Sequence, residues 1–306
     1  MKKNFLPKII PVIMLVLVAV TSCAQPTTDN PSGDKPSGGG SGSDAIINLA
    51  FIKAVELSAN NPEIAMMGGG EIGWKKEPDG TVKLTPENLE KIRAVKALDL
   101  SCYEGMDDPM FGSLNKEKLK DFSDIRWFTG LEYLACFSNE IEELDLSSNT
   151  ALMALHCSYN NISSLDLSSN TALMVLDCSD NNISSLDLTQ NAALTEVNCR
   201  NNKLEELNVA GCSELDSLEC QNNQLTSLVL PAGEVFYSLL CYSNRLTQLD
   251  VTGCPGLEFL YCGLQTSDGT TGQNLELTMT EKMRDGVWNK CKGYEYNSDV
   301  NVILAP

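Results

Sequence analysis

Seven of the twelve cysteines in this 306-residue chain recur at a spacing of 21 residues. They are Cys136, Cys157, Cys178, Cys199, Cys220, Cys241 and Cys262. Thiols in such a series could form disulfides, or they could bind a metal as thiolates. Which of these is open to them depends on the element that repeats with the same period.

Other chemistry has little support in the sequence. His156 is the only histidine, and no serine or cysteine lies in a recognised nucleophile motif. The chain also has no phosphate-binding loop and no zinc motif. We therefore expect no catalytic residue, no resident metal and no cofactor, and we interpret the protein as non-enzymatic.

Carboxylates are the remaining candidate ligands, since the formal net charge is -19. Four of them share one position of the repeat: Asp145, Asp166, Asp187 and Asp250. The first three stack on neighbouring units and could form a weak cation ladder, although a solvated acidic stripe is the simpler interpretation. Residues 77–87 faintly resemble a calcium loop, but Lys75 and Pro86 stand where ligands are required, which argues against calcium. The strong negative charge also disfavours nucleic acid as a partner.

The element that positions these side chains is a repeat of 21 residues, most clearly seen as LMALHCSYNNISSLDLSSNTA from Leu152 to Ala172. The units share the pattern L-x-x-L-x-C-x-x-N-x-[IL]-x-x-L-x-[LV]. This pattern resembles the leucine-rich repeat, with Cys in place of the third aliphatic residue of its strand. The resemblance covers residues 131–265 and implies a solenoid with a parallel sheet on its concave face.

Period-two alternation around each Cys predicts a half-buried strand in every unit. Twenty-one residues leave little room for a helix, so we expect short extended or 3-10 segments on the convex face. The fold prediction is a β-rich solenoid with α-helical elements in its N- and C-terminal caps. One unit buries too little to fold alone, so stacking must supply the stability.

Strand geometry decides the chemistry of the cysteine column. In-register parallel strands lie ~4.8 Å apart, whereas disulfides need Cβ atoms ~3.8 Å apart. We therefore expect free, buried thiols. An asparagine column should pair turn backbone groups rather than bind a ligand; it comprises Asn139, Asn160, Asn181, Asn202, Asn223 and Asn244, with Gln265 at the end.

The flanks should cap the solenoid, with residues 44–130 as an N-terminal cap containing a partial repeat and 266–306 as a C-terminal cap. We expect a helix over Ile46 to Leu57, with Ser43 or Asp44 as its N-cap, and a second helix starting after Thr85. Val95 to Ser101 copies the LDLS half of a repeat. Downstream we expect a helix from Thr280 to about Lys290 and a strand over Val300 to Leu304.

Residues 1–22 read as a lipoprotein signal peptide, with a basic head and an apolar stretch too short to span a bilayer. They end in Val-Thr-Ser before Cys23, which resembles a bacterial lipobox and implies lipidation of Cys23; an ordinary signal with an incidental Cys is the alternative. Residues 23–43 are rich in Pro, Gly and Ser and predict a flexible linker. We expect an exported, membrane-anchored protein on the cell surface or on the periplasmic side of the outer membrane.

The variable residues between the buried ones form the expected binding face, whose ends are aromatic and whose centre is polar and acidic. Exposed aromatic residues are typical interface anchors, although Phe259 and Tyr261 could instead pack against the cap. The candidate contact residues are Tyr133, Phe137, His156, Tyr159, Asp177, Glu196, Arg200, Glu219, Tyr242 and Tyr261.

The chain resembles bacterial leucine-rich-repeat lipoproteins and internalin-like proteins. This resemblance implies a non-catalytic binding protein that recognises a protein or other macromolecule. The Cys in the strand and the lack of a visible sortase signal depart from internalins and put a host-receptor role in doubt. The alternatives are a glycan-capturing surface protein and a structural spacer of the envelope.

Overall fold

The structure is a computed structural model, and it describes residues 46–59, 64, 67, 72–103, 115–267, 270–271, 274–292 and 299–305. The chain divides into two units, Met1–Ala45 and Ile46–Pro306. The predicted signal peptide, Cys23 and the linker therefore lie outside the described residues. Everything below concerns the second unit.

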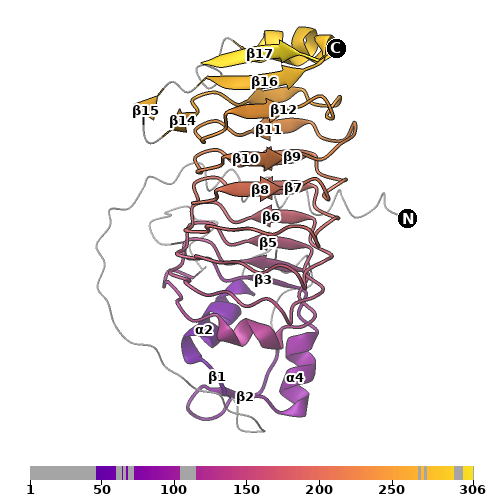
Figure 1. The fold of residues 1–306 in the computed structure, drawn as a ribbon. Coiled ribbons are helices and arrows are strands. Elements are labelled where there is room, and N and C mark those ends of the chain that lie inside the picture. Colours follow the sequence, from indigo (N-terminus) through magenta and orange to yellow (C-terminus); the bar gives the residue numbers. More distant parts are fainter. Residues whose placement is uncertain are drawn as a thin grey trace. The chain divides into compact units, whose positions relative to one another are not determined.

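The repeats of this unit form a parallel sheet of eight strands, stacked in chain order (Figure 1). The chain thus folds as the solenoid that the 21-residue period predicts. The strands are β3 (Ala97–Asp99), β4 (Tyr133–Ala135), β5 (Ala154–His156), β6 (Val175–Asp177), β7 (Glu196–Asn198), β9 (Ser217–Glu219), β11 (Ser238–Leu240) and β13 (Phe259–Tyr261).

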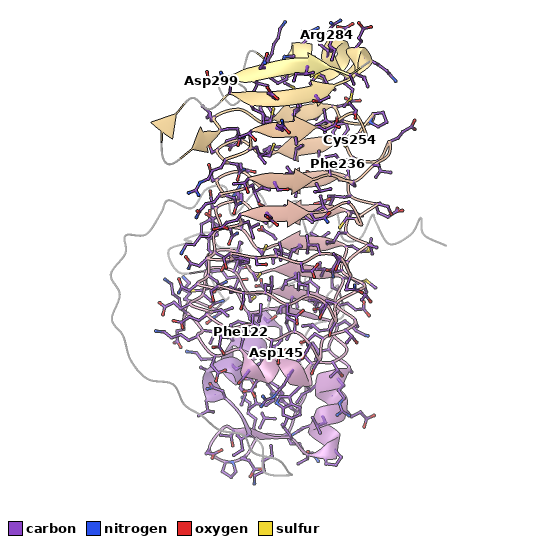
Figure 2. All side chains as sticks on the ribbon, in the orientation of Figure 1. Phe122, Asp145, Phe236, Cys254, Arg284 and Asp299 are labelled. Carbon is purple, nitrogen blue, oxygen red and sulfur yellow. The ribbon has the colours of Figure 1, made fainter. Side chains whose placement is uncertain are left out.

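Neighbouring strands pair residue for residue, so equivalent positions of successive units lie side by side. Leu134 pairs with Leu155 and Leu155 pairs with Leu176, for example. The central residue of each strand and the Cys that follows it point into the core, and all seven cysteines of the column have 0% exposure. Phe236 replaces the leucine at the start of its unit and is buried like the residues it replaces (Figure 2).

The return arms of the later units form two smaller parallel sheets. β8 (Glu206–Asn208) pairs with β10 (Ser227–Val229), and β12 (Gln248–Asp250) pairs with β16 (Leu275–Met279). The earlier arms are not strands, although Asp145, Asp166 and Asp187 accept a hydrogen bond from the backbone N–H two residues later, as Asp250 at the end of β12 does. The expected short extended segments are therefore present, and three of them are strands.

The asparagine column has the predicted structural role. The Asn160 amide nitrogen donates to the carbonyls of Cys136 and Cys157, both at 3.0 Å, and its oxygen accepts from the Ile141 N–H. The same contacts recur along the column, and Gln265 bonds to Cys241, Cys262 and Leu246 in the same way. Each amide thus fastens one unit to the next.

A second asparagine ladder runs along the turns of the return arms. The Asn170 amide nitrogen donates to the carbonyls of Leu146 and Asn149, and Asn191 repeats these contacts one unit later. Cys212 takes the next place in this ladder, and its thiol donates to the Leu188 carbonyl at 3.9 Å. The thiol of Cys254, labelled in Figure 2, donates to the Pro231 carbonyl at 3.2 Å.

The N-terminal cap differs from expectation at its start. β1 (Ile46–Ile47) pairs antiparallel with β2 (Val82–Lys83), and α2 (Leu49–Ser58) begins only after Asn48, whose side chain caps it. The predicted start at Ile46 is wrong, because the antiparallel pairing with Val82 holds the first two apolar residues in a strand. Helix α4 (Pro86–Arg93) begins as predicted, with the Thr85 hydroxyl accepting from the Asn88 N–H.

The partial repeat in this cap is also corrected. Leu98 pairs with Leu134, so Val95 to Ser101 supplies the strand half of a unit and not the LDLS return arm that it copies in sequence. A 3-10 helix, η1 (Ser123–Trp127), then leads into the first complete unit, and Ile125 and Phe128 are fully buried.

At the other end, the expected helix is continuous but irregular. Thr280 caps α5 (Glu281–Met283), a π-helical turn η2 (Arg284–Trp288) follows, and α6 (Asn289–Cys291) ends it. The predicted final strand is confirmed as β17 (Val300–Leu304), which pairs with β16 and extends the return-arm sheet. A short hairpin of β14 (Thr266–Ser267) and β15 (Thr270–Thr271) precedes them.

Candidate functional site

The side chains that the eight-stranded sheet turns away from the core are called here the sheet face. Each unit contributes the first and third residues of its strand and the second and third residues after the strand. All ten predicted contact residues belong to this face. The structure divides them into a buried group and a group that reaches solvent.

Four of the predicted contacts are buried, so the expectation that they are exposed is wrong. Tyr133, Phe137, His156 and Asp177 are each at most 5% exposed. The Tyr133 ring lies 5.7 Å from the His156 ring, and the Phe137 ring lies 5.3 Å from Tyr103. These four side chains contact neighbouring residues and form part of the protein interior.

His156 is the least satisfied residue of this buried group. Neither of its ring nitrogens has a hydrogen-bond partner, and the same holds for the Ser158 hydroxyl two residues later. Burial lowers the pKa of His156 to about 4, so the imidazole is neutral at pH 7. Burial raises the pKa of Asp177 on the next strand, although the Ser179 N–H and hydroxyl both donate to its carboxylate.

The other six contacts are partly exposed: Tyr159, Glu196, Arg200, Glu219, Tyr242 and Tyr261. Apart from Tyr159, they belong to the units of β7, β9, β11 and β13. The part of the sheet face on these four units, together with the residue directly before each of their strands, is called the open half. It is the part of the predicted surface where most of the solvent-accessible contact residues lie.

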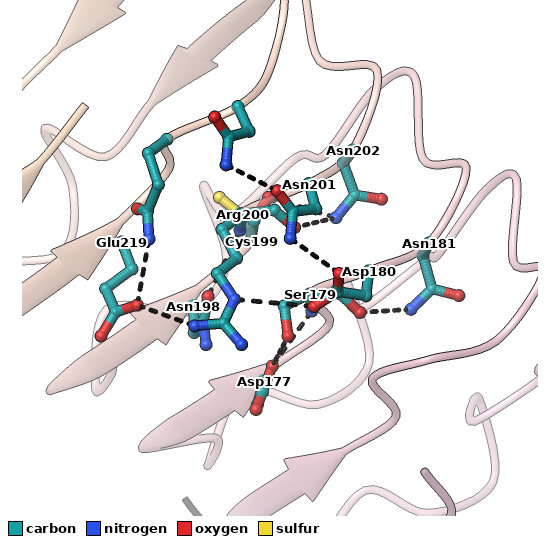
Figure 3. A network of polar contacts seen from close by, with 12 residues as sticks. Asp177, Ser179, Asp180, Asn181, Asn198, Cys199, Arg200, Asn201, Asn202 and Glu219 are labelled. Carbon is teal, nitrogen blue, oxygen red and sulfur yellow. Dashed lines mark hydrogen bonds and ion pairs between the residues drawn. The ribbon is translucent and has the colours of Figure 1, made fainter. Parts of the chain in front are cut away.

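Arg200 is the centre of a polar network in the open half (Figure 3). Its guanidinium lies 3.5 Å from the Asp180 carboxylate and 3.8 Å from that of Glu219. Although burial alone would lower the pKa of Arg200, these carboxylates raise it. The arginine therefore holds its charge and cross-links three neighbouring units.

An amide chain runs beside this network. The Asn201 side chain donates to Asp180 at 2.7 Å, and the Asn222 side chain donates to Asn201 at 2.8 Å (Figure 3). These residues occupy a turn position whose backbone φ lies between 53° and 57° in every unit. Asn and Asp tolerate this left-handed conformation well, whereas Tyr159 and Leu264 adopt it at a steric cost.

Sequence reasoning missed two features of the open half. Tyr237 is 40% exposed, and its ring lies 5.2 Å from that of Phe259, which is 43% exposed. Asp216 lies in the same column of the repeat as Tyr237, directly before the strand, and is also exposed. This column was left out because the period-two alternation through each strand turns the residue directly before it away from the face.

The cysteines offer no reactive group to this face. All eleven cysteines of the described residues are unbridged and buried. Burial raises the pKa of Cys199 to about 12 and raises the pKa of its neighbours in the column as well. The thiols are thus protonated at neutral pH and pack as small apolar groups.

Outside the sheet face, the described residues form a cleft but no cluster of metal ligands. Among the described residues, no three His, Cys, Asp or Glu side chains are grouped so that they could hold a metal ion. A cleft of about 540 Å³ lies in the C-terminal cap between Trp288 and Asn301, and none of its lining residues belongs to the eight-stranded sheet. In the part of the chain that the structure describes, no helix has the length and apolar composition needed to cross a membrane.

Comparison with known proteins identifies similar structures but no family. No protein-family model matches the chain, and no curated protein matches it. Among solved structures, the functional domain of InlJ from Listeria monocytogenes, described as including a cysteine ladder, is 23% identical over 78% of this chain and 53% of that chain, with a TM-score of 0.49. The leucine-rich repeat domain of APL1B is 21% identical over 66% of this chain and 64% of that chain, with a TM-score of 0.47.

Internalin C2 from Listeria monocytogenes is 14% identical over 82% of this chain and 96% of that chain, with a TM-score of 0.51. The chain spans about half the length of the InlJ domain and 64% of the APL1B domain. Identities this low bear on the fold alone. Together with the stacked 21-residue units, the likeness to internalin C2 shows that the chain has the leucine-rich-repeat fold.

Proposed function

We propose that the protein is a non-catalytic recognition module that binds a partner protein through the open half of the sheet face. The observation that carries this proposal is the contrast along one sheet. Its first strands bury their outward side chains, whereas β7, β9, β11 and β13 keep charged and aromatic side chains partly exposed. Exposed aromatic residues beside charged ones are typical of protein interfaces.

Site-specific photo-crosslinking in cells producing the full chain tests this proposal. A photoreactive amino acid replaces Tyr242 or Glu219 on the open half, and in matched controls it replaces Ser185 or Gln190, which are exposed on a return arm. We expect one protein species to be crosslinked from the two face positions and not from the controls. Crosslinking that is absent, or equal at all four positions, would instead favour a structural spacer.

The same experiment separates a glycan from a protein partner. A crosslinked product that shifts after glycosidase treatment and not after proteolysis of the partner identifies a captured glycan. Aromatic and amide side chains such as Tyr242 and Asn222 can also bind sugar rings. Their presence is the observation that favours a glycan as the second candidate. A product sensitive to protease alone supports the protein-binding proposal.

We also propose that the protein is exported and anchored by a lipid on Cys23. The basic head, the short apolar stretch and the small residue before Cys23 support this proposal. Growth with an alkyne-tagged fatty acid should label the protein, and Cys23→Ala should remove the label and release the protein from membranes. Equal labelling of both proteins would refute the anchor and leave the open half unaffected.

A further inference from the structure

Three carboxylates lie close together in the open half. Asn198 pairs with Glu219 and Glu196 pairs with Ser217, so Glu196 and Glu219 are diagonal neighbours on adjoining strands. The Asp216 N–H donates to the Thr195 carbonyl at 2.8 Å, which places Asp216 beside Glu196. Burial raises the pKa of Glu196, and the nearby carboxylates of Asp216 and Glu219 raise it further.

The protein neutralises this cluster only in part. Arg200 lies between Asp180 and Glu219 and is closer to Asp180. Within the described residues, no ion pair includes Glu196 or Asp216. These carboxylates therefore repel one another, and a cation supplied by a ligand would reduce that repulsion.

Gln221 is a second and independent sign of a missing partner. Its side chain is 3% exposed, and its amide nitrogen contacts the Glu219 carboxylate at 3.3 Å. Its amide oxygen is buried and accepts no hydrogen bond. A buried acceptor without a donor costs free energy, and an N–H group of a ligand at Glu219 would relieve this cost if the Gln221 amide turns its oxygen toward the surface on binding.

An apolar surface adjoins these acceptors on the following strands. Glu219 pairs with Leu240, which is half-exposed, and Leu240 pairs with Tyr261. Beyond them the rings of Phe259 and Tyr237 contact each other and are exposed. Since β9 and β13 are two strand spacings apart, about 10 Å separates the acidic part from the aromatic part.

We propose that the open half binds an extended protein segment that carries a Lys or Arg side chain two to four residues from an aromatic or large aliphatic side chain. The cation lies on Glu196 and Glu219, with an N–H near the Gln221 oxygen, and the apolar side chain packs on Phe259 and Tyr237. This inference rests on the proposed function and names the chemistry of its partner. Charge complementarity favours such a segment over acidic peptides and anionic glycans, which the cluster repels.

Selection from a random peptide display library on the full chain tests the proposal. We expect the selected peptides to combine Lys or Arg with an aromatic or large aliphatic residue at this spacing. A synthetic copy of the best peptide should bind at least tenfold more weakly to Glu196→Gln/Glu219→Gln. Its affinity should also fall as sodium chloride is raised from about 50 to 500 mM, because salt screens the attraction between the ligand cation and these partly exposed carboxylates.

The charge-matched control is Asp166→Asn/Asp187→Asn, which removes the same charge from the return arms and should bind like the wild type. Near-ultraviolet circular dichroism of both double variants checks that they are folded. Neutral or acidic selected peptides that still crosslink to the face would overturn this inference and leave the proposed function standing. Selection of no peptide, together with binding of an anionic glycan to the same face, would overturn both.

Discussion

The side-chain amide of Asn181 makes four hydrogen bonds inside the solenoid. It donates to the carbonyls of Cys157, Cys178 and Ser179 and accepts from the Ile162 N–H. Asn181→Ala leaves the buried Ile162 N–H without a partner and removes one of the two amide donors of each Cys carbonyl, since Asn160 and Asn202 still donate to Cys157 and Cys178. We expect a loss of roughly 2 kcal/mol in the free energy of unfolding. Urea unfolding of the variant measures it.

The neighbouring Asn182→Ala is the control, because the Asn182 side chain is partly exposed and only its backbone N–H bonds to the Ile162 carbonyl. It should change stability by no more than about 0.5 kcal/mol. Equal losses in the two variants would mean that the ladder amides do not fasten the units.

His156 makes stability depend on pH. Its pKa is about 4 in the folded protein against an ordinary value of 6.5, so the unfolded chain binds the proton more tightly. The folded state is therefore progressively disfavoured as the pH falls from about 7 to about 4, by roughly 3 kcal/mol at the lower end. His156→Leu should remove this loss and should also gain stability at pH 7, since two unpaired nitrogens disappear.

Urea unfolding at several pH values compares the variants directly. His156→Gln keeps a polar side chain that does not titrate, so it should flatten the pH dependence without the gain at pH 7. Parallel stability curves for wild type and His156→Leu between pH 7 and 4 would show that His156 is not the titrating group.

Gly256 lies in a turn between a return arm and a strand, and the backbone of the preceding unit leaves no space there for a side chain. A Cβ at Gly256 would lie 2.0 Å from the Glu234 carbonyl oxygen of the preceding unit, which is rigid backbone. Gly256→Ala should therefore push these two turns apart and cost roughly 2–3 kcal/mol. Gly253→Ala, whose Cβ would meet only the Ala232 methyl at 3.8 Å, should be neutral. Thermal denaturation of the pair gives the answer, and similar melting temperatures would contradict it.

At the scale of the strands and turns, the sequence predicted the repeated features reliably. Six copies of one Asn position and seven of one Cys position define register, strand and core, because each column has a single environment in a stack. It was unreliable where one segment fits two places: Leu98-Asp99-Leu100 matches a return arm by composition, yet it pairs as β3 with β4.

The candidate site was predicted in outline only. The period-two alternation predicted which side chains point away from the core, and Glu196, Arg200 and Tyr242 are partly exposed as expected. It could not show that Tyr133 and Phe137 are covered, since that depends on Tyr103 and His156 packing against them across units. Nor could it find Gln221, whose unpaired oxygen is visible only with its neighbours placed.

As a whole molecule, the solenoid should open from its ends. Each unit contacts mainly its two neighbours, so a terminal unit loses fewer interactions on opening than a central one. The buried thiols report this, because Cys291 lies in the C-terminal cap and Cys199 lies in the middle. With iodoacetamide under native conditions, mass spectrometry should find Cys291 alkylated faster than Cys199. Identical rates would mean that the solenoid opens only as one cooperative body.

The asparagine ladder has a consequence for how such a gene can change length. Because every amide makes the same bonds to the unit before it, excising one whole unit between Asn160 and Asn202 would rejoin matching donors and acceptors. Loss or duplication of a full unit of coding sequence thus leaves a foldable product, whereas a gap of any other size breaks the register. The units from β7 to β13 carry the open half, so under the proposed function such events there would lengthen or shorten the surface that a partner contacts.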